Sequence, residues 1–74
     1  MKEGDQVEVR LWHTDVPAGT LDGMEGNYRT WVGPWLQGVV HGTDRWGNPW
    51  VLYRGEDGYM DARYFRVSDT RKVV

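Results

Sequence analysis

The side chains that could do chemistry in this chain are mainly aromatic. Five Trp, four Tyr and one Phe stand among 74 residues, and a domain of this size buries only ~60% of the surface that its unfolded chain exposes. Ten rings exceed what one small core can hold, so several are expected at the surface. Exposed Trp and Tyr supply rigid contact area at low entropic cost and dominate recognition surfaces. The composition therefore predicts a binding surface.

Groups suited to catalysis or metal binding are sparse. The chain has no cysteine, which excludes a disulfide framework, a thiolate nucleophile and a zinc finger. Ser68 is the only serine, and His13 and His41 are the only histidines. None of them stands at a spacing that specifies a nucleophile and base or a ligand set. We predict that the protein is not an enzyme and needs no metal or cofactor.

Charge and hydropathy exclude further classes. Nine Lys and Arg face eleven Asp and Glu, a formal charge of −2, which argues against a strong polyanion binder. No apolar run approaches the ~18 residues of a membrane span, and the first six residues lack the apolar centre of a signal peptide. We expect a cytoplasmic protein, of the cell or of an infected host. The absence of isoleucine and the scarcity of lysine indicate a high-GC bacterium or its phage.

The elements that must position the aromatic residues are strands. Ten glycines and many valines favour twisted strands joined by tight turns over helices, and apolar residues alternate with polar ones from residue 7 to 11. A twisted hairpin is expected between residues 13 and 34, a bulge or bend at Gly38, tight turns at 42–49 and 55–58, and one 3₁₀ turn at 62–65. The expected strands are 7–11, 28–32, 35–41, 50–54, 59–62 and 66–67.

Such elements predict one all-β domain, a small, strongly bent barrel of about five strands with a long first loop and a 3₁₀ turn before the last strand. The domain is expected to span residues 1–74, with its folded core at about 4–69 and a frayed tail at 70–74. Its expected core residues are Val7, Val9, Leu11, Leu36, Val40, Val51, Tyr53, Met60, Phe65 and Val67.

The order of these features resembles the SH3-like barrel, over about residues 4–69. Trp12 ends the first strand where SH3 domains place an aromatic of their peptide groove, and Trp35 opens the second strand where they place a ligand-contacting Trp. The segment 62–65 resembles their 3₁₀ turn, whose Tyr, here Tyr64, faces the peptide. Asp61 stands where the family has a proline. Tudor and agenet modules have similar strands at 4–9 and 33–40, and KOW-type nucleic-acid modules share the fold.

The resemblance implies a groove for a partner. Its expected residues are Trp12, Trp35 and Tyr64, with Asp15, Asp22 and Glu25 on the long loop beside them. Tyr59 adds a further ring close to Asp61, the arrangement that an aromatic cage around a cation needs. The loop carboxylates favour a basic partner.

We therefore expect a non-enzymatic interaction module that binds a protein or peptide, acting as a small accessory or inhibitory protein. The alternative is a nucleic-acid-binding small barrel that uses arginines interleaved with stacking rings. Self-association through the same apolar surface is a further alternative. Trp31, Trp46 and Trp50 either cap the open ends of the barrel or join the binding surface.

Overall fold

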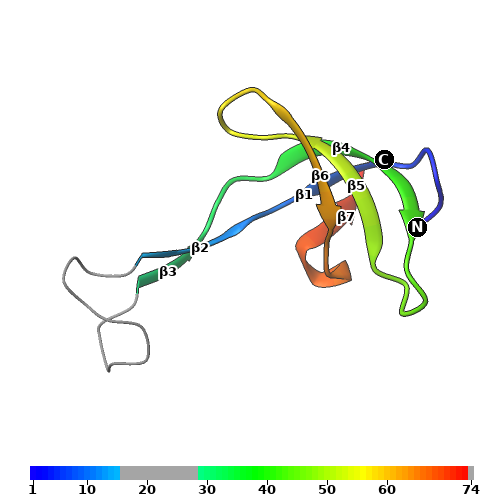
Figure 1. Ribbon diagram of the computed structural model, residues 1–74, viewed down its shortest axis with the longest axis horizontal. Coiled ribbons are helices and arrows are strands. Elements are labelled where there is room, and N and C mark those ends of the chain that lie inside the picture. Colours follow the sequence, from blue (N-terminus) through cyan, green and yellow to red (C-terminus); the bar gives the residue numbers. More distant parts are fainter. Residues whose placement is uncertain (16–28, 74) are drawn as a thin grey trace.

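The structure, a computed structural model that describes residues 1–15 and 29–73, consists mostly of strands (Figure 1). One antiparallel sheet has the strand order β6-β5-β4-β1-β7, and a second sheet pairs β2 with β3. A 3₁₀ helix, η1, precedes the last strand. The elements are β1 (Gln6–Val9), β2 (Trp12–Asp15), β3 (Arg29–Val32), β4 (Leu36–Thr43), β5 (Pro49–Arg54), β6 (Met60–Tyr64), η1 (Val67–Asp69) and β7 (Thr70–Lys72).

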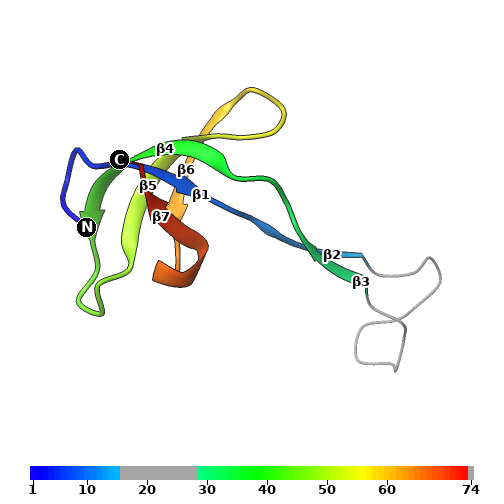
Figure 2. The same cartoon turned by 180° about the vertical axis from the view of Figure 1, so that it is seen from behind.

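This architecture confirms the predicted small all-β domain with five main strands, a long first connection and a 3₁₀ turn before the last strand. The first connection is ordered as predicted where the structure describes it, because β2 and β3 pair from Trp12 opposite Val32 to Asp15 opposite Arg29. Figures 1 and 2 show this two-stranded arm projecting from one side of the main sheet. In the described part of the chain, no helix is both long and apolar enough to cross a membrane.

The core lies on one face of the main sheet and follows the alternation seen in the sequence. Six of the ten predicted core residues are buried, and Leu11 and Leu36 pack against them while partly exposed. The rings of Tyr53 and Phe65 meet edge to face, 5.2 Å between centroids, a favourable aromatic geometry. The buried six are Val7, Val9, Val40, Val51, Tyr53 and Phe65.

The remaining two predicted core residues are exposed. Met60 pairs with Arg54 in the register of β5 and β6, so it lies on the face opposite Tyr53, since neighbours along a strand point to opposite faces. Val67 belongs to η1, which has no buried residue. Both predictions were wrong. The hairpin register decides which way Met60 faces, and Val67 lies in a 3₁₀ helix that buries none of its residues, where a strand was expected.

Gly38 lies within regular pairing, opposite Val7 on one side and Tyr53 on the other. The register of β4 and β5 shifts between Val40 and Gly42, so the bulge expected at Gly38 occurs near His41. Gly38 has a different role. A β-carbon there would lie 2.6 Å from Val51 Cγ1 and 2.9 Å from the Leu52 carbonyl oxygen, so the neighbouring strand requires glycine.

The turn between β5 and β6 was predicted correctly. Gly55 N–H donates to the Tyr59 carbonyl at 2.8 Å, and Gly58 N–H donates to the Gly55 carbonyl at 2.9 Å. Gly58 has φ +85°, a conformation that L-residues with a side chain rarely adopt. This turn fixes the register of the whole hairpin, including the pair between Trp50 and Tyr64.

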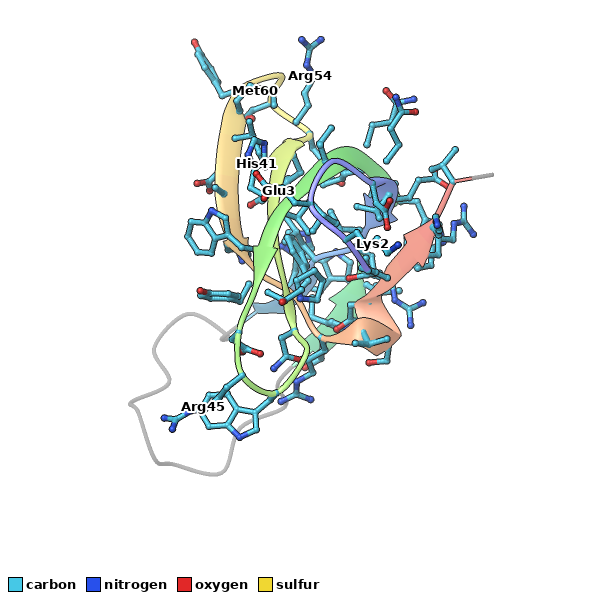
Figure 3. The ribbon with its side chains drawn as sticks, turned by 90° about the vertical axis from the view of Figure 1, so that its right-hand side faces the viewer. Lys2, Glu3, His41, Arg45, Arg54 and Met60 are labelled. Atoms are coloured by element: carbon cyan, nitrogen blue, oxygen red, sulfur yellow. The ribbon has the colours of Figure 1, made fainter. Side chains whose placement is uncertain are left out.

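Asp44 organises the turn between β4 and β5. Its Oδ1 accepts hydrogen bonds from the backbone N–H groups of Trp46 (2.9 Å) and Asn48 (2.8 Å), and its Oδ2 accepts one from Asn48 Nδ2 (3.1 Å). Desolvation opposes ionisation, but these hydrogen bonds outweigh it and the pKa of Asp44 is lowered. The turn presents Trp46, which is 73% exposed, with Arg45 4.5 Å from its ring centroid. Figure 3 shows Arg45 at this tip, far from Arg54 and Met60.

Replacing Asp44 with alanine should lower the urea concentration at the unfolding midpoint, because two backbone N–H groups and the Asn48 side-chain amide lose their common acceptor. Urea unfolding followed by tryptophan fluorescence measures this change. Asp44→Asn retains an acceptor oxygen and should lie between the wild type and Asp44→Ala. Equal stability of all three proteins would show that the turn does not depend on the carboxylate.

The C-terminal segment differs from the prediction by a few residues. The segment expected as a 3₁₀ turn, 62–65, is the end of β6 and the residue that follows it, and the 3₁₀ helix is Val67–Asp69. The tail expected to fray contains β7, which pairs with β1 from Thr70 opposite Val9 to Lys72 opposite Val7. Thr70 is buried, and its hydroxyl donates to the Arg66 carbonyl at 3.0 Å. The sequence did not predict this edge strand because its three residues are all polar.

Candidate functional site

A groove of about 440 Å³ lies where the beginning of β2, the end of β6 and η1 converge. Trp12, 56% exposed, and Tyr64, 54% exposed, stand on it as the first residue of β2 and the last of β6. We call it the aromatic groove. It is lined by Arg10, Leu11, Trp12, Arg63, Tyr64, Phe65, Arg66 and Asp69.

Backbone contacts hold the three walls of the groove together. Phe65 N–H donates to the Pro49 carbonyl at 3.0 Å, which anchors the end of β6 to the beginning of β5. Arg10 N–H donates to the Asp69 carbonyl at 3.0 Å, which ties the segment between β1 and β2 to η1. These contacts fix the end of β6 to β5 and the segment before β2 to η1, so the groove is formed without a ligand, as binding sites usually are.

Asp69 fixes the orientation of Trp12. Its Oδ1 accepts hydrogen bonds from Trp12 Nε1 at 2.9 Å and from Arg10 Nε at 3.1 Å. The indole donor contributes most to lowering the pKa of Asp69; burial raises the pKa, and Arg10 lowers it further by hydrogen bond and charge. The Trp12 ring is thus exposed yet held in place, which suits a contact residue since little entropy remains to be lost on binding.

Trp35 lies outside the lining of the aromatic groove. The Arg10 guanidinium carbon is 5.8 Å from the Trp12 ring centroid and 5.0 Å from that of Trp35, and Arg71 is 4.1 Å from the Trp35 ring centroid. Arg71 also donates to Glu8 Oε1 at 2.9 Å. The Arg10 guanidinium therefore contacts both Trp12 and Trp35, and of the three predicted rings only Trp12 and Tyr64 line the groove.

The ring that accompanies Tyr64 is Trp50. The two rings meet edge to face with centroids 4.8 Å apart, in the geometry that aromatic pairs prefer. They line a neighbouring shallow hollow with His41, Gly42 and Thr43. Because Tyr64 lines this hollow as well as the groove, the aromatic surface continues from Trp12 to Trp50.

Sequence reasoning left Trp50 undecided between a capping and a binding role. A usable signal was present in the turn at 55–58. Counting outward from that turn pairs residue 54 with 60 and residue 50 with 64, which puts Trp50 directly across from Tyr64. The sequence offered Arg10, Arg63 and Arg66 only among the arginines of the nucleic-acid alternative. They are distant in sequence, so only the fold shows that these three share one groove.

Tyr59 lies on a second hollow that adjoins the aromatic groove. The two share Leu11 and Arg63. Tyr59 is among the most exposed rings of the described residues, and its backbone N–H donates to Asp57 Oδ1 at 3.0 Å. We call this second surface the acidic hollow, after Glu56, Asp57 and Asp61 in its lining.

The predicted loop carboxylates cannot be placed in the same way. Asp15 ends β2, opposite Arg29 in the pairing of β2 with β3. Asp22 and Glu25 lie outside the described residues. Their contribution to the groove, and the basic partner that they favour, stay predictions.

His13, the other histidine besides His41, lies close to Glu56 of the acidic hollow. Its Nε2 is buried without a hydrogen-bond partner and lies 3.9 Å from Glu56 Oε2, while its ring stacks on Trp31 with centroids 5.4 Å apart. Among residues 1–15 and 29–73, no cluster of three or more His, Asp or Glu side chains could hold a metal ion.

Comparison with known proteins adds no relative. The chain matches no family model, and neither the curated proteins nor the solved structures include a match.

Proposed function

We propose that this protein is an interaction module that binds a segment of another protein in the aromatic groove. The observation that carries the proposal is the pair of half-exposed rings, Trp12 and Tyr64, on one preformed groove. Such rings, when buried by a partner, provide most of the binding energy in protein interfaces. The SH3-like resemblance assigned both rings to a peptide groove, although Tyr64 ends β6 and does not lie on the 3₁₀ turn on which its assignment was based.

The shape of the surface supports an extended ligand. The aromatic groove adjoins the acidic hollow on one side through Leu11 and Arg63, and on the other side it continues over Tyr64 to Trp50. A linear peptide could follow these neighbouring depressions with alternate side chains. An accessory or inhibitory role, by occupying the surface of another protein, fits a single small domain.

A nucleic-acid ligand is the second candidate, because three arginines and two rings line the same groove. Guanidinium groups and stacking rings together bind single strands. The carboxylates of Glu56, Asp57 and Asp61 in the adjoining hollow oppose a phosphate backbone that continues along the surface. The peptide is therefore the better-supported ligand.

The test is peptide selection by the whole chain. Random peptides of about ten residues, which span roughly 30 Å when extended, are displayed and selected on the immobilised wild-type protein. We expect Tyr64→Ala to weaken binding of the selected peptides about 30-fold, the effect of a 2 kcal/mol hot spot. Its thermal stability should fall by only about 1 kcal/mol, the worth of the lost contact with Trp50.

Trp46→Ala is the matched control. Trp46 is more exposed than Tyr64 and lies at the tip of the β4–β5 turn, outside the lining of the groove. Its replacement should leave peptide binding unchanged. If Tyr64→Ala stays folded, as circular dichroism would show, and binds the peptides as tightly as the wild type, the aromatic groove is not the binding site.

A further inference from the structure

We propose that the segment bound in the aromatic groove carries carboxylates, which pair with Arg66 and Arg63. The inference rests on the proposed function and specifies the chemistry of the partner. The expectation of a basic partner came from the loop carboxylates, whereas the described lining of the groove has the opposite charge, with three arginines and one aspartate.

The single carboxylate of the groove is already occupied. Asp69 accepts hydrogen bonds from both Arg10 and Trp12, and its side chain is only 14% exposed. The Arg10 guanidinium is engaged in turn with Asp69 and, at 3.3 Å, with the Ser68 carbonyl. The charges of Arg10 and Asp69 therefore neutralise each other. The positive charge that can attract a ligand comes from Arg63 and Arg66.

Arg66 is the more available of these two. It follows β6 on the way to η1, and its backbone carbonyl accepts hydrogen bonds from Asp69 N–H and the Thr70 hydroxyl. Its charge is one of the smaller causes that lower the pKa of Asp69, but among the described residues its guanidinium forms no hydrogen bond or ion pair. Arg63 has an exposed ion pair with Asp61 at 3.9 Å, a kind of pair that contributes little. The Arg63 guanidinium carbon also lies 5.7 Å from the ring centroid of the buried Tyr53, so Arg63 is less available than Arg66. Both guanidinium groups belong to the lining of the groove, and each can bind a carboxylate through paired N–H donors.

The neighbouring charges limit the length of an anionic ligand. Beyond Arg63 the surface becomes the acidic hollow, with three carboxylates in its lining. A polyanion crossing both depressions would meet like charge as soon as it left the groove. A peptide with one or two acidic residues beside an apolar one satisfies the arginines and the rings without this repulsion, so an acidic peptide fits better than a nucleic acid.

The experiment compares two charge reversals on the whole chain. Arg66→Glu changes the groove, and Arg54→Glu is the matched control, since Arg54 is exposed and lies outside the lining of both the groove and the acidic hollow. Peptides selected by the wild type should be enriched in Asp and Glu next to an apolar residue. Arg66→Glu should bind them about tenfold more weakly, a loss of roughly 1.4 kcal/mol, while Arg54→Glu should bind them as the wild type does.

A charge swap in the ligand completes the test. The best selected peptide with its Glu or Asp changed to Lys should lose affinity for the wild type and regain it for Arg66→Glu. Peptides that depend on Tyr64 but show no acidic enrichment would overturn this inference and leave the proposed function standing. Peptides that ignore Tyr64→Ala would overturn both.

A labelled single-stranded oligonucleotide separates the two anionic ligands. At about 0.15 M salt, where exposed charges are screened beyond ~8 Å, we expect no binding that depends on Arg66. If the oligonucleotide binds more tightly than the selected peptides, and Arg66→Glu abolishes this, the ligand is a nucleic acid and the acidic peptide is excluded.

Discussion

Replacing Gly38 with alanine is expected to lower the free energy of unfolding by about 3 kcal/mol, the upper end of the range for overpacking. The added methyl group would lie 2.6 Å from Val51 Cγ1, 2.9 Å from the Leu52 carbonyl oxygen and 3.1 Å from Tyr53 Cβ. Val51 and Tyr53 are buried core residues, and the carbonyl belongs to the strand itself. Relief thus requires β5 to move away from β4 in the centre of the sheet.

Urea unfolding followed by tryptophan fluorescence measures this effect. A domain of this size has only about 4–11 kcal/mol of stability to lose, so Gly38→Ala should shift the midpoint by a large fraction of its value. Gly42→Ala is the control on the same strand, because a β-carbon there meets no atom within 4 Å. Similar midpoints for the two variants would mean that the close approach of β4 and β5 does not exist in solution.

Replacing Asp69 with alanine is expected to affect both stability and binding. The change leaves the Trp12 indole N–H and the Arg10 guanidinium without their shared acceptor, and a hydrogen bond to a charged group contributes roughly 1.5–3 kcal/mol. We expect a loss of about 2 kcal/mol at neutral pH and weaker peptide binding, since the Trp12 ring is no longer held in position.

The pH dependence identifies the carboxylate as the cause. Because the pKa of Asp69 is lowered in the folded state, its stabilising effect is present above the unfolded pKa of about 4 and is lost as the pH falls through the lower folded value. The stabilities of the wild type and Asp69→Ala should therefore converge in acid. Asp5 and Asp44 also have lowered pKa values, so the variant retains some acid sensitivity. A difference that is constant with pH would exclude the ionised group as its source.

Much of the fold was predictable because short-range patterns determine it. The alternation around Val7 and Val9 defines the strand that becomes the middle of the core, and the Asp57-Gly58 pair defines the last tight turn. The errors concern register. Met60 faces solvent because the hairpin register pairs it with Arg54. The strand β7 was not predicted because its own sequence has no apolar alternation, and only its pairing with β1 shows that it is a strand.

The site was predictable to a smaller extent for a related reason. Trp12 and Tyr64, which the SH3-like resemblance singles out, line one groove, and their role in binding stays a prediction. Trp35 was grouped with them, and it lies outside that lining, with Arg10 5.0 Å from its ring centroid. The basic character of the groove depends on residues from three separate segments, and no local pattern in the sequence shows that Arg10 and Arg66 face the same space.

The pairing of β7 with β1 has a consequence for how quickly the chain folds. Arg71 bonds to Glu8 across 63 positions of sequence, so the strand that completes the sheet must find a partner from the opposite end of the chain. The chain loses conformational entropy in closing so long a loop before the contacts between the two strands can form, and this slows folding. Sheets dominated by such remote pairings form on the order of milliseconds to seconds. During synthesis, one edge of β1 therefore stays unpaired until β7 has left the ribosome.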